Sequence, residues 1–286
     1  MFKFIGRQWR GEAPFWTSVL LASLLLPWAL VLGGLSWLSV FTIDQTPYAS
    51  MVAAAVVFTL IALLAVWQFV GTWRATSRAR TPARGRIARW TGRTVAGTSL
   101  ALSAVALLTV PGAMTSYYAE ATDADWIGQR GHTLTIAGDG IVVSGYLSWG
   151  LYYEFVDALQ ANPAIRTVVL NSPGGHYAVG LRMGRLIRDR GLTTVTTEMC
   201  GSACTFAFLG GRERVLGRGA RLGFHAMAGN TEVVLSRMQA HAAETLAAAE
   251  VPQDFIARIF ETPSNDVWYP NTEELRAANI VTGSAN

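Results

Sequence analysis

Three long stretches without a charged residue limit the fold of this chain more than any other feature. Each stretch is longer than the roughly 20 residues that a helix needs to cross the hydrocarbon core of a membrane. Hydrophobic residues make up 51% of the 286 residues, which is a high share for a purely soluble protein. We therefore predict three membrane-spanning helices, near residues 16–38, 50–72 and 95–116.

The first and third stretches have alternatives. Lys3, Arg7 and Arg10 precede the first, as in a secretory signal peptide. Its apolar run exceeds the ~7–15 residues of such a signal, and no convincing small-x-small cleavage site follows. The third could be a buried core helix, but its length and the border of Arg93 and Tyr117 favour a spanning segment. We favour membrane spans in both places.

Arginine is distributed unevenly around these stretches. The loop near Asp44 has no arginine or lysine, whereas the loop after the second stretch carries seven arginines, at positions 74, 78, 80, 84, 86, 89 and 93. By the positive-inside rule the N-terminus and this arginine loop are cytoplasmic, and the chain after the third helix lies outside. We therefore expect an integral protein of a bacterial inner membrane with a periplasmic or extracellular C-terminal domain. The arginine loop could also bind anionic membrane lipid, although a topology signal is the simpler interpretation.

The formal net charge of +4 combines two opposite parts. Residues 1–118 carry +8, and residues 119–286 carry −4. The basic balance therefore belongs to the membrane topology, and it gives no support for a nucleic-acid partner.

The chain beyond residue 118 has the composition of a globular domain. We expect a linker at 119–131 and one domain at 132–286. Alternating or β-branched runs indicate strands, and apolar residues at helical spacing indicate helices between them. This alternation predicts an α/β fold with a parallel sheet and functional residues at the carboxyl ends of its strands. The expected strands are 132–136, 141–147, 165–170, 192–197, 214–216 and 220–224, and the expected helices are 151–161, 176–190, 203–209, 231–250 and 252–260.

A tight Gly201–Ser202 turn joins a strand to a helix near the centre of this domain. Such a turn exposes a serine hydroxyl where free backbone N–H groups favour developing negative charge. Ser202 is therefore our candidate nucleophile, and it requires a base and an oxyanion hole.

Few residues can act as the base. Lys3 is the only lysine and lies on the far side of the predicted membrane, which excludes a Ser–Lys dyad. His225 ends a predicted strand that runs parallel to the one leading to the serine, so it is the preferred base. His176 is the rival, but its place after a glycine turn suits substrate contact better. We expect His132 and His241 to be surface residues.

Three motifs in this order resemble a known family: NSPGG at 171–175, GSA at 201–203, and His225 at a strand end. Together they resemble the Clp protease proteolytic subunit, a serine peptidase of the ClpP/crotonase fold, over about residues 132–282. The resemblance implies an α/β fold of repeated ββα units behind three transmembrane helices. A serine bracketed by cysteines is similar to a membrane-anchored, periplasmic type of this family.

The resemblance also implies roles for single residues. A serine peptidase of this kind has a nucleophile, a base and two backbone N–H groups that bind the oxyanion. The matching positions are Ser202 as nucleophile, His225 as base, and Ala203 with Gly175 or Gly174 as oxyanion donors.

Asp266 stands where the family has its orienting acid, ahead of an aromatic residue and a Glu273-Glu274 helix. The resemblance therefore implies a Ser-His-Asp triad. The match carries a small insertion, so Asn265 or Glu273 could take this role instead.

The chain differs from the family in the partner and the substrates that we expect for it. It lacks the family's methionine after the serine, and a cytosolic ATPase could not reach an external domain. We therefore expect no ATPase partner, and peptide or protein substrates that are small, already unfolded or close to the membrane. The family forms rings, so a homo-oligomer is compatible with the resemblance, and no cofactor is implied.

Cys200 and Cys204 are the only cysteines, and they bracket the serine. They could simply pack as small buried residues. An oxidising compartment and a spacing of about one helical turn favour a Cys200–Cys204 disulfide instead. A metal site is not expected, because two thiols without nearby histidines do not make a four-coordinate site.

The preferred interpretation is a membrane-anchored, serine endopeptidase-like hydrolase. The alternative is a catalytically inactive relative whose cleft binds peptides or envelope partners. A crotonase-type enzyme acting on acyl-coenzyme A fits poorly, because enolate chemistry does not need a serine at a turn with a histidine base.

Overall fold

A computed structural model of the protein describes residues 2–14, 16–19, 25–41, 45–78, 84–108, 110–121, 131–228 and 232–284. The chain divides into two compact units. One unit comprises residues 1–42 and 47–118, and the other comprises residues 43–46 and 119–286.

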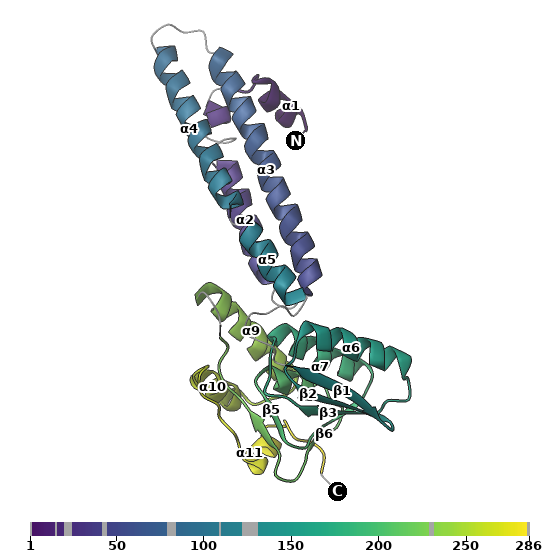
Figure 1. Ribbon diagram of the computed structural model, residues 1–286. Coiled ribbons are helices and arrows are strands. Elements are labelled where there is room, and N and C mark those ends of the chain that lie inside the picture. Colours follow the sequence, from purple (N-terminus) through teal and green to yellow (C-terminus); the bar gives the residue numbers. More distant parts are fainter. Residues whose placement is uncertain are drawn as a thin grey trace. The chain divides into compact units, whose positions relative to one another are not determined.

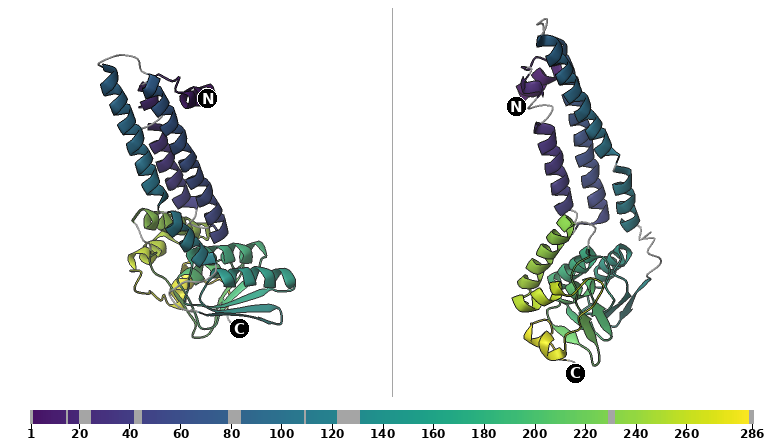
Figure 2. Two further views of the ribbon diagram at one scale, coloured as in Figure 1. Left: turned by 45° about the horizontal axis from the view of Figure 1, so that its top comes forward. Right: turned by 90° about the vertical axis from the view of Figure 1, so that its left-hand side faces the viewer.

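The first unit is helical. Its longest helix, α3, packs against α1, α2 and α4, and α3 and α4 run side by side in all views (Figures 1 and 2). A buried polar contact joins α1 to α3, because the Gln8 amide nitrogen donates to the Thr72 hydroxyl over 3.3 Å. The helices are α1 Phe2–Arg10, α2 Leu26–Phe41, α3 Pro47–Arg78, α4 Arg84–Leu107 and α5 Val110–Ala121.

Two helical segments in the described part of the chain are long and apolar enough to cross a membrane, Pro47–Ser77 and Arg89–Gly112. They overlap the second and third predicted spans. The predicted span at 16–38 includes residues 20–24, which lie outside the described residues. The helix that overlaps it, α2, has 16 residues, fewer than the roughly 20 that a span needs. Three membrane-spanning helices are therefore not confirmed.

The second unit is a mixed α/β structure. Its main sheet has the order β1-β2-β3-β4-β6, in which β1 pairs antiparallel with β2 and every other pair is parallel. The prediction of an α/β fold with a parallel sheet is thus confirmed. The predicted linker at 119–131 includes residues 122–130, which lie outside the described part. The strands are β1 His132–Ala137, β2 Gly140–Gly145, β3 Thr167–Asn171, β4 Thr193–Thr196, β5 Met199–Gly201, β6 Arg214–Leu216 and β7 Arg221–Gly223.

The helices of this unit bury regular apolar faces. In α7, Val179, Met183 and Ile187 recur every fourth residue and are fully buried, as an amphipathic helix requires. Helix α7 packs against both α6 and α8. Helix α9 packs against α10 (Figure 1). The helices are α6 Trp149–Ala161, α7 Tyr177–Asp189, α8 Ala203–Phe208, α9 Glu232–Ala248, α10 Gln253–Glu261 and α11 Thr272–Ala277.

A second, two-stranded parallel sheet of β5 and β7 leads to the predicted nucleophile. The sequence predicted that one strand, 192–197, runs into the turn at Ser202. Instead, the chain bends after β4 because the Asn171 side-chain oxygen accepts hydrogen bonds from the Thr197 and Glu198 N–H groups, each over 3.1 Å. This bend separates β5 from the main sheet.

Candidate active site

Ser202 lies in a sharp turn between β5 and α8 and has an unusual backbone conformation. Its φ is +53° and its ψ is −126°, in a region that residues other than glycine rarely adopt. The Ser202 N–H donates to the Gly223 carbonyl over 2.9 Å. The Ser202 carbonyl accepts from the Thr205 N–H at 3.0 Å and from the Thr205 hydroxyl at 2.7 Å. These bonds fix the backbone on both sides of the serine.

Gly174 comes close to this turn from the loop after β3. Its φ is +114°, and a Cβ at this position would lie 2.7 Å from the Cβ of Ser202 and 2.9 Å from the Gly201 carbonyl oxygen. Only glycine fits this conformation and this space. The NSPGG motif is therefore in direct contact with the Ser202 turn.

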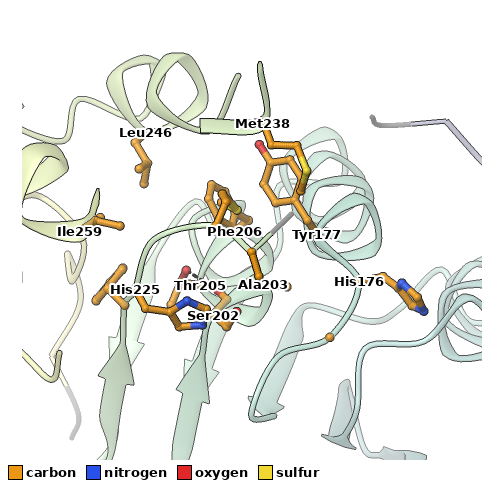
Figure 3. Close-up of a pocket in the computed structure, with 14 residues that line it drawn as sticks. His176, Tyr177, Ser202, Ala203, Thr205, Phe206, His225, Met238, Leu246 and Ile259 are labelled. Carbon is orange, nitrogen blue, oxygen red and sulfur yellow. Dashed lines mark hydrogen bonds between the residues drawn. The ribbon is translucent and has the colours of Figure 1, made fainter. Parts of the chain in front are cut away.

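The small sheet brings His225 to Ser202. Strands β5 and β7 are parallel, with Gly201 opposite Gly223, so Ser202 and His225 follow the carboxyl ends of neighbouring strands. Both residues are half-buried and line the same pocket (Figure 3). The Ser202 hydroxyl makes no hydrogen bond to any other described residue.

The His225 ring is held by its own chain. Its Nδ1 lies 2.7 Å from the Ala226 carbonyl oxygen, which can only accept a hydrogen bond. The proton of the neutral ring therefore belongs on Nδ1, and Nε2 keeps its lone pair. A histidine in this tautomer can accept a proton at Nε2.

The structure does not bring Asp266 to His225. Asp266 is exposed, and its carboxylate accepts a hydrogen bond from the N–H of Val267 over 2.7 Å. Phe224 pairs with Trp268 through two 2.9 Å backbone bonds, which fixes the segment that carries Asp266. The alternatives Asn265 and Glu273 are exposed as well.

The backbone N–H groups of Gly175 and Ala203 lie beside Ser202. Neither has a hydrogen-bond partner among the described residues. Both residues line the pocket that contains Ser202. The N–H of Gly174, by contrast, donates to the Ser172 hydroxyl over 3.1 Å. Of the two glycines that the sequence left open as oxyanion donors, the structure thus leaves Gly175 available.

The pocket beside Ser202 has a volume of about 220 Å³ and is largely apolar. Its walls come from α7, α8, α9, α10 and the segment after β7, and Figure 3 shows several of their side chains around one space. An apolar side chain is the ligand group that such a lining favours. The apolar and aromatic lining residues are Tyr177, Ala203, Phe206, Phe224, Met227, Ala228, Met238, Leu246 and Ile259.

A disulfide joins Cys200 in β5 to Cys204 in α8, with 5.3 Å between their Cα atoms. Both cysteines are fully buried. The bond closes a small ring of backbone around the Ser202 turn.

The remaining histidines have other environments. His176 also lines the pocket, but it packs edge-on against Tyr146 and lies apart from Ser202 and His225 in Figure 3. His132 and His241, which we expected at the surface, are half-buried and have contacts of their own. The His132 ring contacts the Ser148 hydroxyl at 3.1 Å and the Glu154 carboxylate at 3.3 Å. The His241 ring contacts the Tyr177 hydroxyl at 3.1 Å.

The sequence missed several residues that shape this site. Thr205 was assigned only to the helix after the turn, although a hydroxyl three residues after a turn residue is a common partner for that residue's carbonyl. Met238 and Leu246 carried no signal, because nothing in the α9 sequence indicates which element it covers. Within the described part, no group of three or more histidine, cysteine or carboxylate side chains is placed to bind a metal.

No protein-family model matches the chain. No curated protein matches it either. Among solved structures, the chain is similar to ClpP1 from Listeria monocytogenes, at 19% identity, and to a point mutant of that protein, at 21% identity. Each has a TM-score of 0.45, and each match covers 51% of this chain and 91% of the other.

Proposed function

We propose that the α/β unit is a serine peptidase with Ser202 as nucleophile and His225 as general base. One observation carries this proposal. A serine in a strained turn, a histidine with its Nε2 lone pair available, and the two N–H groups without partners line one pocket. Acyl transfer by serine needs these three components in one place.

The reaction follows from their roles. His225 Nε2 takes the proton from the Ser202 hydroxyl as Oγ attacks the carbonyl carbon of the substrate. The carbonyl oxygen becomes negative and is bound by the N–H groups of Gly175 and Ala203. The tetrahedral intermediate then breaks its C–N bond, and the amine leaves with the proton from His225. Water, deprotonated by the same histidine, hydrolyses the acyl-enzyme and regenerates Ser202.

Two groups are candidates to orient the His225 ring, the Ala226 carbonyl and the Asp266 carboxylate. The Ala226 carbonyl already holds His225 Nδ1 at 2.7 Å. Asp266 remains the prediction from the sequence, and it would have to turn away from the Val267 N–H to reach the ring. We propose that the carbonyl is sufficient for the base to work.

The apolar pocket suggests which bonds are cut. A substrate carbonyl placed between Ser202 and the two N–H groups would have its neighbouring side chain next to Phe206, Met238 and Ile259. We therefore propose cleavage next to a medium-sized apolar residue. A charged side chain would lose its hydration there without a partner.

We further propose that the helical unit anchors the enzyme in a membrane with the peptidase outside. Five apolar residues along α3 are each more than half exposed, which is unfavourable in water and expected in lipid: Val52, Val56, Leu60, Leu63 and Val66. The arginine distribution supports a cytoplasmic N-terminus. A reporter fused after Asn286 that is active only outside the cytoplasm would support this orientation, and activity only inside would reverse it.

Hydrolysis of fluorogenic peptides tests the peptidase proposal. Full-length protein in detergent should cleave peptides with leucine or methionine at the cut site faster than matched peptides with aspartate or lysine there. Ser202→Ala should abolish this cleavage while leaving the thermal unfolding temperature unchanged. If folded wild type binds the peptides without cleaving them, the site is a peptide-binding cleft and the enzyme assignment is wrong.

A further inference from the structure

A disulfide bond spans the Ser202 turn, and it takes no part in the proposed chemistry of peptide cleavage. Cys200 precedes the serine by two residues, and Cys204 follows it by two. Their disulfide links the end of β5 directly to the first turn of α8, across the strained residue. Both cysteines are fully buried, so the bond lies under the site and leaves the pocket free.

A second contact acts on the same backbone unit. Thr205 is buried, and its hydroxyl and N–H both donate to the Ser202 carbonyl. A positive φ at serine is unfavourable, and it persists only where the surroundings determine it strongly. The disulfide restrains the residues around Ser202, and the Thr205 bonds restrain its carbonyl.

We propose that the Cys200–Cys204 disulfide and the Thr205 hydroxyl form a brace that positions the Ser202 hydroxyl for attack. This inference rests on the proposed peptidase function. The cysteines and Thr205 are positioning residues, because their effect passes through the backbone of Ser202. The brace acts mainly on the rate of acyl transfer, because most of the pocket lining comes from α7, α9, α10 and the segment after β7. Thr205 also lines the pocket, so its variants are compared with the cysteine variant, in which no pocket residue changes.

The brace has a consequence for where the enzyme can work. A chain with two reduced thiols lacks this covalent restraint. The site therefore reaches full activity only after oxidation of the two thiols to the disulfide, with two electrons and two protons passing to a disulfide or quinone oxidant. Such oxidants operate outside the cytoplasm.

The first test compares kcat and KM for one apolar peptide between wild type and Cys200→Ala/Cys204→Ala, both as full-length protein in detergent. We expect kcat to fall about 10- to 100-fold in the double variant, because small displacements of reacting groups have effects of this size. KM should stay within about twofold. The matched control is Ile187→Val, which loosens the core at a fully buried residue of α7 and should leave kcat unchanged.

Reduction of the wild type tests the same point without a mutation. Warming with a water-soluble phosphine converts the S–S bond, the phosphine and one water into two thiols and a phosphine oxide, and mass spectrometry after alkylation counts the thiols. Reduced wild type should lose kcat as the double variant does, whereas the double variant should not respond to the phosphine. Unchanged kcat in the double variant would overturn the role of the disulfide.

Two variants of Thr205 distinguish a role in positioning Ser202 from a contribution to stability alone. Thr205→Val removes the hydroxyl and keeps the shape, and we expect about a tenfold loss of kcat with little change in KM. Thr205→Ser keeps the hydroxyl and should restore most of the rate. Equal activity of the valine and serine variants would exclude the hydroxyl from the brace.

If the peptidase proposal itself is wrong, the result differs from that expected when only the brace is wrong. Wild type would then cleave no peptide in either redox state, and amide hydrogen exchange would decide on the brace. The Ser202 and Thr205 N–H groups are both hydrogen-bonded. Loss of the disulfide should accelerate their exchange at least about tenfold relative to the N–H of Leu170 in the main sheet. Unchanged exchange would overturn the brace.

Discussion

The two sheets of the α/β unit differ in size and in which residues follow the strand ends. Strand β3 lies inside the main sheet, between two parallel neighbours, and its Val168 and Leu170 are fully buried. Strands β5 and β7 are three residues each, yet Ser202 follows the end of β5 directly and His225 comes two residues after the end of β7. We propose that the main sheet provides stability and that the small sheet positions the two residues of the proposed reaction. Mutations in the two sheets should therefore have separable effects.

The largest effect is expected at the base. His225→Gln should lower kcat for peptide cleavage about 10²- to 10⁴-fold, the usual contribution of a general base. The thermal unfolding temperature should stay close to that of the wild type, because the ring is only half-buried. A variant that loses stability and keeps its activity per folded molecule would assign His225 a structural role, and the two sheets would then not differ in function.

The main sheet should show the opposite behaviour. Leu170→Ala removes a fully buried side chain from β3. We expect a loss of about 2–5 kcal/mol in the free energy of unfolding, from lost burial and the remaining cavity. Thermal unfolding followed by tryptophan fluorescence measures the loss, and kcat per folded molecule should change little. A large fall of kcat at full stability would contradict the division between the sheets.

Arg214 lies in β6, at the edge of the main sheet, and a substitution there tests how much its hydrogen bonds stabilise this edge. Its guanidinium donates to three backbone carbonyls, those of Ile280 at 2.9 Å, Gly211 at 3.1 Å and Asn279 at 2.6 Å. Burial lowers the pKa of Arg214, and nearby Arg188 lowers it further, while Glu250 opposes both.

A lysine at position 214 cannot make the same three bonds from one planar group. Arg214→Lys should therefore cost about 1–2 kcal/mol of unfolding free energy. Peptide cleavage should be unaffected. An unchanged unfolding temperature would mean that water replaces these bonds without cost.

The smallest effect is expected at Asp266. Because the Ala226 carbonyl already holds His225 Nδ1, Asp266→Asn should change kcat less than about threefold and should not move the pH profile of kcat/KM. A loss of 10²-fold or more would show that Asp266 orients the base in the working enzyme. The triad predicted from the sequence would then be correct.

The sequence predicts the order of strands and helices in the α/β unit well, because local patterns determine each element. The β-branched run at residues 165–170 and the apolar residues Leu181, Leu186 and Ile187 of the next helix are such patterns. The predicted parallel direction of the strands leading to Ser202 and His225 is also what the structure has.

What the sequence could not predict depends on contacts between distant residues. The bend that separates β5 from β4 comes from Asn171, 26 and 27 residues before the N–H groups that it binds. The wall that α9 adds to the pocket and the contact between His241 and Tyr177 both arise from packing that no periodic pattern shows. The choice between Gly174 and Gly175 depended on one hydroxyl, that of Ser172.

Covalent labelling with a fluorophosphonate tests directly whether Ser202 is a nucleophile. The full-length protein in detergent is treated with the probe beside Ser202→Ala and His225→Gln, and the modified residue is mapped by mass spectrometry. We predict one adduct per wild-type molecule, on Ser202, none on the alanine variant, and much slower labelling of the glutamine variant. If folded, disulfide-bonded wild type takes up no label, or carries it on another residue, Ser202 is not the nucleophile.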